Sequence, residues 1–317
     1  TSPIGGAINS ISTEAEITNT QFSENHSDGR GCDYYQESGN IKFKNVSFSS
    51  FKRMSVHSEK YQSFDNVYHI EFEDCRFNSA AFDEFMEKLN NSRRNFTYLD
   101  KLLKYCEGEI LLDSDIVLDD SEISEFEKGI QIDVQGTVLN GNGHSIDARG
   151  KLRIFYVDQP FTLKNITLKN GYDRNSGGAI YNNNDLLLEE VTFIKNTSGN
   201  WGGAINDSAK TKVISCNFYE NEGVSGSCIF KDSGLLEVVN CRFERNTGYD
   251  GIIDTLYDDT EIVIKDSVFH ENSLRNSGVI YNSSKTKIFN CIFSQNCALT
   301  GGAIENIKEI TVIKSQF

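Results

Sequence analysis

Proline, tryptophan and methionine are scarce in this chain of 317 residues, which holds two prolines, one tryptophan and two methionines beside 25 glycines. Its turns must therefore be made by glycine and asparagine rather than by proline. No apolar run approaches the length of a membrane-spanning helix, and the first residues do not begin a signal peptide. The net charge of −15 argues against nucleic acid as a partner, because its phosphates would be repelled.

The motifs of common catalytic and metal sites are also missing. The sequence has no P-loop, nucleophile elbow or zincin motif, and its eight cysteines show no Cys-x-x-Cys or Cys/His metal spacing. The five histidines are scattered without ligand spacing: His26, His57, His69, His144 and His270. We therefore predict a non-enzymatic protein with no catalytic residues, no cofactor and no assigned metal ligands.

A repeat dominates what is present. Phe-x-x-Asn recurs at intervals of 25, 25, 26 and 24 residues, opened by Phe193, Phe218, Phe243, Phe269 and Phe293 and closed by Asn196, Asn221, Asn246, Asn272 and Asn296. Gly-Gly-Ala-Ile occurs at residues 5–8, 177–180, 202–205 and 301–304, with degraded copies at 226–229, 250–253 and 277–280. A fixed period in the twenties indicates one supersecondary unit stacked on copies of itself.

The columns of the repeat show which unit it is. The positions seven, five and two places before the Phe are mostly apolar, which predicts two short strands with a slip of phase between them. The residue three before the Phe is always polar and lies at that slip, where we expect a bend: Glu190, Ser215, Asn240, Asp266 and Asn290. Such coils predict an all-β fold, a right-handed parallel β-helix, with the handedness taken from the chirality of parallel crossovers. The Phe and Asn columns should stack inside it.

Cysteines occupy one column of this repeat. Cys75, Cys216, Cys241 and Cys291 all stand two residues before a Phe, and Cys228 replaces the alanine of a Gly-Gly-Ala-Ile motif. Small apolar residues stacked inside the coil explain this position, so we predict buried thiols. A disulfide between Cys216 and Cys241 on adjacent turns is the alternative.

Three segments are predicted along the chain. Residues 1–78 carry the same frame in worn form, around Phe22, Phe48 and Phe77. Residues 79–106 show two amphipathic stripes, with Ser79 and Thr97 as expected starts, and predict a helical cap or insertion over the mouth of a β-helix. Residues 107–317 form the main β-helix. Both ends fall inside repeats, so we expect a fragment of a larger protein.

The repeat resembles two groups of surface proteins. Gly-Gly-Ala-Ile alternating with Phe-x-x-Asn resembles the repeat of chlamydial polymorphic outer-membrane proteins. The run of residues 139–148, continued by 153–155 and 163–167, is similar to adhesin-like proteins of methanogenic archaea, in which a helix and such a run precede the repeat coils. The resemblance implies an extracellular, adhesive β-helix with no known catalytic residues.

One turn is the best place to imagine catalysis. His144 and Asp147 lie close to Arg149 and Arg153, an acid/base set that could serve glycan cleavage. The simpler interpretation is a tight Gly-Asn-Gly turn followed by a strand with Ile146 facing inward. We favour the turn, because short spacing alone does not establish an active site.

One coil concentrates acidic residues: Asp250, Asp254, Asp258, Asp259 and Glu261. Oxygen ligands at this density could hold Ca²⁺. Since the periodic calcium nonapeptide is missing, we favour a solvated acidic loop.

Three functions remain to be separated. The first is a cell-surface adhesin or stalk that binds a glycan or protein of a host or neighbouring cell. The second is a polysaccharide lyase or glycoside hydrolase, which needs carboxylates or basic residues clustered on one face. The third is glycan binding without hydrolysis, for which exposed aromatic residues near the Gly-Gly-Ala-Ile corners are candidates: Tyr172, Tyr181, Trp201, Tyr249 and Tyr281.

Glycosylation sequons add a weak hint of a surface protein. They start at Asn25, Asn45, Asn90, Asn95, Asn165, Asn196, Asn206 and Asn282. Asn196 is expected to lie in the inward ladder and to be unavailable.

Overall fold

The computed structural model describes residues 6–10, 13–25, 31–36, 39–58, 70–255 and 260–317. The chain divides into two compact units, residues 1–93 and residues 94–317. This division falls inside the expected helical segment 79–106, so that each unit takes one of its helices. Each unit is built from parallel β-solenoid turns, about 11 in the chain, which confirms the predicted fold class.

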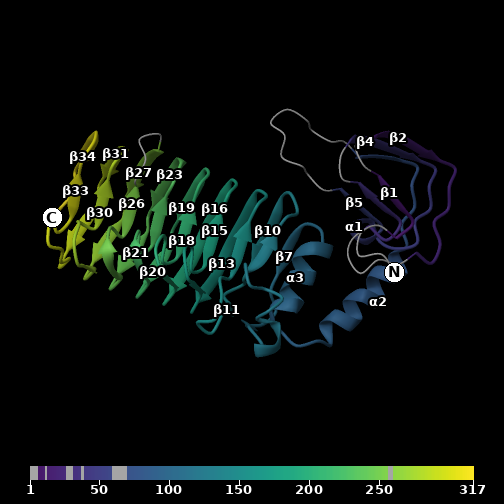
Figure 1. Ribbon diagram of the computed structural model, residues 1–317, viewed down its shortest axis with the longest axis horizontal. Helices are drawn as coiled ribbons and strands as arrows, with labels where there is room; N and C mark the ends of the chain where they lie inside the picture. Colours follow the sequence, from purple (N-terminus) through teal and green to yellow (C-terminus); the bar gives the residue numbers. More distant parts are fainter. Residues whose placement is uncertain (1–5, 11–12, 26–30, 37–38, 59–69, 256–259) are drawn as a thin grey trace. The chain divides into compact units, whose positions relative to one another are not determined.

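The larger unit is a coil with three parallel sheets running along it (Figure 1). One sheet has 15 strands: β7 (Glu109–Leu111), β8 (Ile116–Val117), β10 (Thr137–Asn140), β11 (Ser145–Asp147), β13 (Phe161–Lys169), β16 (Leu186–Ile194), β19 (Thr211–Ile214), β20 (Asn217–Tyr219), β23 (Gly234–Val239), β24 (Arg242–Glu244), β27 (Thr260–Lys265), β28 (Val268–His270), β31 (Lys285–Phe289), β32 (Ile292–Ser294) and β34 (Ile310–Ile313). Each full turn of the regular part contributes the two halves of this sheet on either side of the predicted bend.

Two smaller sheets complete each turn. The second has eight strands: β9 (Ile130–Ile132), β12 (Phe155–Val157), β15 (Ile180–Asn182), β18 (Ile205–Asp207), β22 (Ile229–Lys231), β26 (Ile253–Thr255), β30 (Ile280–Asn282) and β33 (Ile304–Asn306). The third has five: β14 (Tyr172–Asp173), β17 (Thr197–Ser198), β21 (Glu222–Ser225), β25 (Thr247–Asp250) and β29 (Ser273–Leu274). Strand, corner and strand therefore recur at the same place in the turns from β14 to β29, where all three sheets are present.

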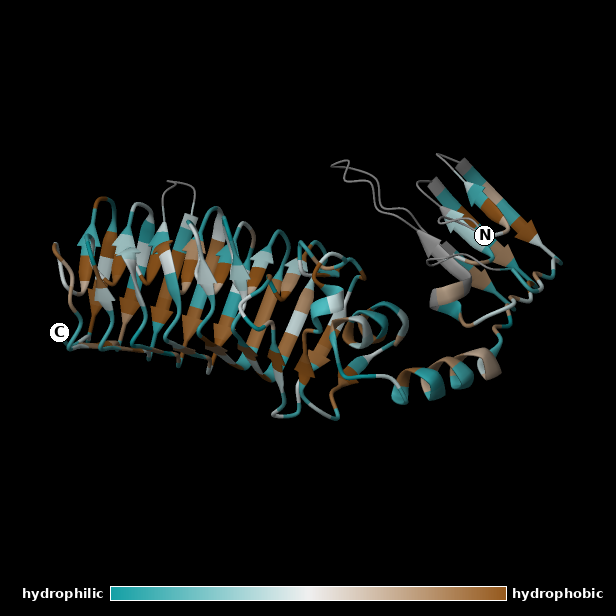
Figure 2. Ribbon diagram, turned by 60° about the horizontal axis from the view of Figure 1, so that its bottom comes forward, coloured by the Kyte–Doolittle hydropathy of each residue, from teal (hydrophilic) through white to brown (hydrophobic). Residues whose placement is uncertain are grey.

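The predicted phenylalanine column is confirmed. Leu168 pairs with Phe193, and each later Phe pairs with the Phe of the next turn. Their rings stack nearly parallel with centroids 4.6–4.8 Å apart, and none of the five is more than 3% exposed. Buried aromatic stacking at the strand spacing locks one turn onto the next. Figure 2 shows the resulting alternation of hydrophobic and hydrophilic residues along the strands.

The predicted bend is also confirmed, and a second one was missed. All five residues of the polar column three places before the Phe have left-handed backbone, with φ between +51° and +56°. Two places after the Phe a second left-handed column follows, with φ between +53° and +55°: Lys195, Glu220, Arg245, Glu271 and Gln295. Long charged residues rarely adopt this conformation, so their chemistry gave no signal for the second bend.

The asparagine column forms a buried ladder along the axis. The Nδ2 of each Asn donates to the Oδ1 of the Asn one turn further on, at 2.9–3.0 Å, from Asn196 to Asn296. Each Nδ2 also donates to the backbone carbonyl of the Phe column, for example from Asn221 to Phe193 at 3.1 Å. The ladder pairs polar groups that the second bend would otherwise bury unpaired.

Glycine is required at the Gly-Gly-Ala-Ile corners for two reasons. The first glycine is left-handed, with φ +65° at Gly177 and +63° at Gly202. The second glycine allows neighbouring turns to approach, because a Cβ on Gly178 would lie 2.3 Å from the carbonyl oxygen of Gly203. Both reasons follow from the absence of a side chain.

The cysteine column lies inside the coil as predicted. Cys216, Cys228 and Cys291 are fully buried and Cys241 is 3% exposed, whereas Cys75 is only partly buried; none of the eight cysteines forms a disulfide. The alternative disulfide between Cys216 and Cys241 is therefore wrong; instead the Cys216 amide donates to the Cys241 sulfur at 3.4 Å.

Helix α3 (Phe96–Tyr105) lies at the N-terminal end of the larger unit and contacts β8 and β9. Its N-cap is Asn95, whose side chain accepts from the amide of Tyr98 at 3.0 Å, so the helix begins before the expected start at Thr97. The Glu122 carboxylate, at the end of a short 3₁₀ helix η1 (Asp120–Glu122), accepts from the Thr97 amide at 2.7 Å. A negative group at a helix N-terminus is favourable.

The smaller unit contains three worn turns, as predicted. Strands β2 (Thr13–Thr18), β4 (Gly39–Lys44) and β6 (Ile70–Glu73) form one parallel sheet, and β1 (Ile8–Ser10), β3 (Tyr34–Gln36) and β5 (Val56–Ser58) another. A four-residue helix α1 (Lys52–Ser55) was not predicted. Phe48 stacks between Phe22 and Phe77 with centroids at 5.5 and 4.7 Å.

Helix α2 (Ser79–Asn90) closes this smaller unit. Its N-cap is Asn78, whose side chain accepts from the amide of Ala81 at 3.3 Å, so the expected cap Ser79 is the first helical residue instead. Phe82 and Phe85 of the helix pack on Phe51 at 5.1 and 5.4 Å. Among the described residues, no helix is both long and apolar enough to cross a membrane.

Candidate functional site: a trough on the five-stranded sheet

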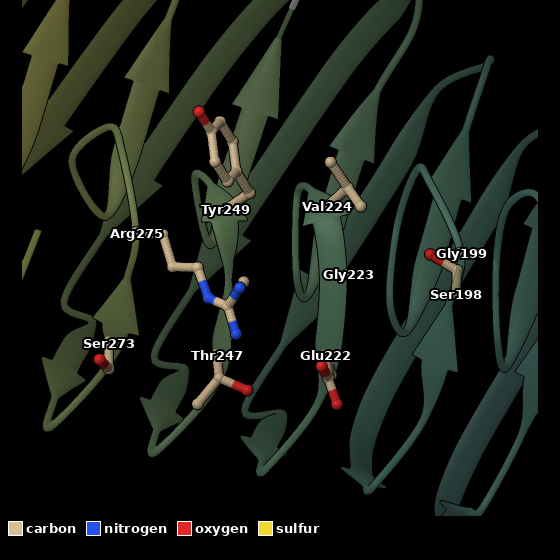
Figure 3. Close-up of a pocket in the computed structure, with 10 residues that line it drawn as sticks. Ser198, Gly199, Glu222, Gly223, Val224, Thr247, Tyr249, Ser273 and Arg275 are labelled. Carbon is tan, nitrogen blue, oxygen red and sulfur yellow. The ribbon is translucent and has the colours of Figure 1, made fainter.

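The outer surface of the five-stranded sheet carries an open trough of about 640 Å³. It crosses the strands β17, β21, β25 and β29 of four consecutive turns (Figure 3). Its lining is Ser198, Gly199, Glu222, Gly223, Val224, Thr247, Gly248, Tyr249, Ser273 and Arg275. The trough runs along the axis of the solenoid, from one turn to the next.

Strand alternation decides which side chains face this trough. Gly223 and Gly248 pair in register and occupy inward positions. A Cβ on Gly248 would lie 2.1 Å from the Ser227 Oγ of the neighbouring corner, so no larger residue fits there. The residues directly before and after each glycine along its strand point outward, since successive side chains of a strand face opposite sides.

The outward side chains form two rows, as Figure 3 shows. Glu222, Thr247 and Ser273 pair in register and make a polar row, whereas Val224 and Tyr249 make an apolar one. Val224 is 44% and Tyr249 49% exposed, so both side chains present apolar surface to a ligand. An apolar rim beside hydroxyl groups suits a ligand with both apolar and hydroxyl surfaces.

Charges in the trough are balanced and unpaired. Glu222 and Arg275 are both exposed, and within the described part of the chain neither side chain has an ion-pair partner. Across the solenoid such outward charges are commonly paired between turns, as Lys287 is with Glu261 at 3.1 Å. One acid and one base without partners remain available for hydrogen bonds to a neutral polar ligand.

A second trough of about 440 Å³ lies further towards the N-terminal end of the same sheet. Asp147, Arg149, Gly150, Asn170, Gly171, Tyr172, Lys195 and Thr197 line it. Tyr172 is 40% exposed and pairs in register with Thr197, which pairs in turn with Glu222 of the first trough. The two troughs are therefore aligned along one face.

The residues of the hypothetical catalytic turn are not brought together. His144 faces Asp115, with Nδ1 3.6 Å from the carboxylate, and Arg149 pairs with Asp120 at 3.0 Å. Arg153 is buried, where it pairs with Asp173 at 2.8 Å and donates to the carbonyls of the Gly-Gly corner. Ile146 is fully buried, so the interpretation as a turn and an inward strand is confirmed.

The acidic coil departs at Asp254 from the solvated loop that we expected, whereas the Glu261 side chain is 44% exposed as in such a loop. Asp254 is fully buried, and neither of its carboxylate oxygens has a hydrogen-bond partner within the part of the chain that the structure describes. Burial, together with the nearby Asp250 carboxylate, raises the pKa of Asp254 to about 7. Asp258 and Asp259 lie outside the described residues. Among those described, no group of three or more side chains suited to metal binding exists.

Three of the five aromatic candidates are well exposed: Tyr172, Trp201 and Tyr249. Tyr181 instead stacks on Tyr156 with centroids at 5.2 Å. Of the sequons, Asn196 is fully buried as expected, and Asn206 and Asn282 are also buried, which removes them as surface sites.

Glu222, Val224, Thr247, Ser273 and Arg275 were missed as trough residues. A signal for three of them existed, because Glu222, Thr247 and Ser273 each directly follow a ladder asparagine. The strands that start at these residues are too short to show an alternating pattern in the sequence, so the outward direction of these side chains could not be predicted.

Comparison with known proteins agrees with the geometry. Residues 152–317 match the family described as right handed beta helix region, which covers slightly more than half of the chain and all of the trough. No curated protein matches the chain.

Proposed function

The chain belongs to the family of right-handed β-helix proteins, and from that premise we propose that it is a non-catalytic, extracellular surface protein that binds an extended glycan in the trough. The partner would be a glycan on a host or neighbouring cell. Right-handed β-helices occur both in adhesin-like proteins and in polysaccharide-degrading enzymes, so the fold alone does not choose between them. The choice depends on the site.

The observation that carries the proposal is the combination of side chains in the trough. Tyr249 offers an exposed ring face on which a sugar could stack, and Thr247, Ser273, Glu222 and Arg275 offer hydrogen bonds beside it. Aromatic faces bind amphipathic ligands because they bury area at little entropic cost. Four turns at about 4.8 Å per step give a track of roughly 14 Å.

The same lining supports binding rather than cleavage. Glycosidases use two carboxyl groups that flank the scissile bond at about 5–9.5 Å. Glu222 is the single carboxylate among the lining residues of the first trough. In the second trough Asp147 is occupied by the Arg149 amide and by Asn170, both at 2.8 Å.

A glycan array with the whole chain tests the binding, with Tyr249→Ala as the variant and Tyr219→Ala as the matched control. Tyr219 also faces outward, from β20, but it lies on another sheet and lines neither trough. Loss of a stacked ring costs about 0.5–1.5 kcal/mol, so Tyr249→Ala should weaken binding roughly 2- to 13-fold. Equal binding by both variants would contradict the trough as the site.

An activity screen on the same glycans separates the enzyme hypothesis. The wild-type chain should leave every neutral and acidic glycan intact. A hydrolase built on the turn of His144 and Asp147 would cut one of them, and His144→Ala with Asp147→Ala would abolish that turnover, because loss of a general acid or base costs about 10²–10⁴-fold. Such a result would replace the binding proposal.

A further inference from the structure

One ion pair of the larger unit is unlike the others. Asp207 and Lys231 pair in register on the adjacent strands β18 and β22, with the Lys231 Nζ 2.5 Å from the Asp207 Oδ2. Both side chains are 0% exposed, whereas every other ion pair among the described residues keeps some exposure to water. A fully dehydrated pair is costly to bury, so it calls for an explanation.

The fold does not require a charged pair at this place. Asn182, Thr255 and Asn282 hold the equivalent position in neighbouring turns, and all three are neutral and fully buried. Hydrogen bonds satisfy this column elsewhere, as between Asn282 and Asn306 at 2.6 Å. Only Asp207 and Lys231 bring an acid and an amine together here.

The surroundings hold both groups in position. The Asp207 Oδ1 accepts from the Asn182 Nδ2 and from the Thr211 Oγ1, both at 2.8 Å. The Lys231 Nζ donates to the backbone carbonyl of Ala209 as well as to the Asp207 Oδ2. The Ala209 amide also donates to Oδ1, at 3.3 Å, so one carboxyl oxygen is held by three donors while the amine lies against the other.

Burial also favours the uncharged forms. It raises the pKa of Asp207 and lowers the pKa of Lys231, in each case against the attraction of the partner. A buried acid and a buried amine are both driven towards neutrality by desolvation. The neutral amine is the nucleophile, and the neutral carboxylic acid is the form that can lose a hydroxyl group.

We propose that Lys231 and Asp207 join through an intramolecular amide bond that links two adjacent turns. The Lys231 Nζ attacks the Asp207 Cγ, so that the C–N bond forms and the C–Oδ2 bond breaks. The departing Oδ2 hydroxyl takes one proton from the amine and leaves as water, and the nitrogen keeps one hydrogen. No oxidant, reductant or further reactant is needed.

Three features of the site promote this condensation. Contact between the two groups replaces a bimolecular encounter by an intramolecular one. The donors Asn182 and Thr211 are placed to stabilise negative charge that develops on Oδ1. Exclusion of water from a fully buried pair protects the amide from hydrolysis. The bond would close a loop of 24 residues within the turns that carry the trough, independently of any ligand.

Intact mass spectrometry of the whole chain under denaturing conditions tests the bond. The expected mass is lower than the sequence mass by one water molecule, and both Lys231→Met and Asp207→Ala should show their full sequence masses. Digestion with trypsin should leave Lys231 uncut and produce one branched peptide that contains both residues. These are measurements on the covalent chain, so they hold whether or not the variants fold.

Lys287 and Glu261 provide the matched control within the same digest. They too are an amine and a carboxylate on adjacent turns, 3.1 Å apart, but both are partly exposed. Water should keep them charged and unlinked, so they should be recovered in separate linear peptides. A wild-type chain of full sequence mass, with Asp207 and Lys231 in separate linear peptides, would overturn the proposal and leave a buried ion pair.

Discussion

The regular turns of the larger unit and the three worn turns of the smaller one each contain a phenylalanine stack of their own. The two regions differ at the position three residues after each of these phenylalanines. In the regular turns that position is always a ladder asparagine, from Asn196 to Asn296. In the smaller unit it is Asn25, then Phe51, then Ala80. Asn25 donates to Asp33 rather than to another asparagine, and Phe51 packs on helix α2.

This difference explains why one region continues and the other leaves the coil. An asparagine ladder pairs the buried polar groups of one turn with those of the next. Each turn therefore leaves hydrogen-bonding groups that a further turn of the same kind satisfies. An aromatic residue in its place offers a surface for packing instead, and the amphipathic helix α2 covers that surface. In this column an asparagine therefore favours a further regular turn, whereas an aromatic residue favours packing of a helix.

The largest change in the free energy of unfolding should come from substitutions in the phenylalanine stacks, since each region has one. Phe243 is fully buried between two rings at 4.6 Å, whereas Phe22 is 7% exposed and, among the described residues, stacks on one ring, that of Phe48. Phe243→Ala should cost about 3–5 kcal/mol of the free energy of unfolding, and Phe22→Ala less. Denaturation followed by fluorescence of Trp201, the single tryptophan, reports on the larger unit; hydrogen exchange reports on the smaller.

Glu244→Ala is the control, because Glu244 is the outward neighbour of Phe243 and pairs with surface arginines. Its effect should stay within about 0.5–1 kcal/mol. If Glu244→Ala and Phe243→Ala shifted the midpoint of denaturation equally, the phenylalanine stack would not be what holds the turns together.

The second largest effect should be an increase in the free energy of unfolding of the larger unit when Asp254 is replaced by asparagine. The folded pKa of Asp254 is about 7, above its ordinary value of 3.8. A raised carboxyl pKa means that stability is complete below about pH 4 and falls as the pH rises to 7. Asp254→Asn removes this loss, which amounts to at most about 4 kcal/mol.

Unfolding titrations of the wild type and Asp254→Asn at pH 4, 6 and 8 measure this effect. The variant should be more stable at pH 8, and the two curves should converge towards pH 4. A variant that is less stable than the wild type at pH 8 would show that the carboxylate has a stabilising partner.

A smaller effect distinguishes the two regions directly. The Asn246 side chain makes four buried hydrogen bonds, two as donor and two as acceptor. Asn246→Ala should cost about 2–3 kcal/mol, because it leaves buried groups unpaired, whereas Asn25→Ala should cost about 1 kcal/mol or less. Similar costs in both units would show that the ladder is not what separates them.

Much of the fold could be predicted from the columns, because the repeat supplies several copies of the same observation. The Phe stack, the Asn ladder, the first bend and the buried cysteines all follow from residue types that recur at one offset. The helix caps were predicted one or two residues too late, since asparagine, serine and threonine are all good N-cap residues and two candidates stand close together at each helix start. The second bend carried no signal, as its residues are ordinary in any exposed strand.

The candidate site was predicted only in part, for a related reason. Tyr172 and Tyr249 were expected as exposed aromatics, but their common face with Glu222 and Arg275 depends on where the short strands of the third sheet turn. Asp254 was misjudged because an outward position is normally wet. Here the corner that contains Asp250 and Gly251 lies against it, and a Cβ on Gly251 would be 2.9 Å from the Asp254 Cβ.

By itself the sequence determined the period, and a period is enough to specify a stack of parallel turns with its inward columns. Residues 25 apart become neighbours as soon as the turns stack, so the Phe and Asn columns needed no further information. Only the tertiary structure decided which outward residues share a surface and which are covered. Those outcomes depend on corners whose backbone carries no repeating chemical signal, and they place Tyr249 in a trough and bring the buried Asp207 against Lys231.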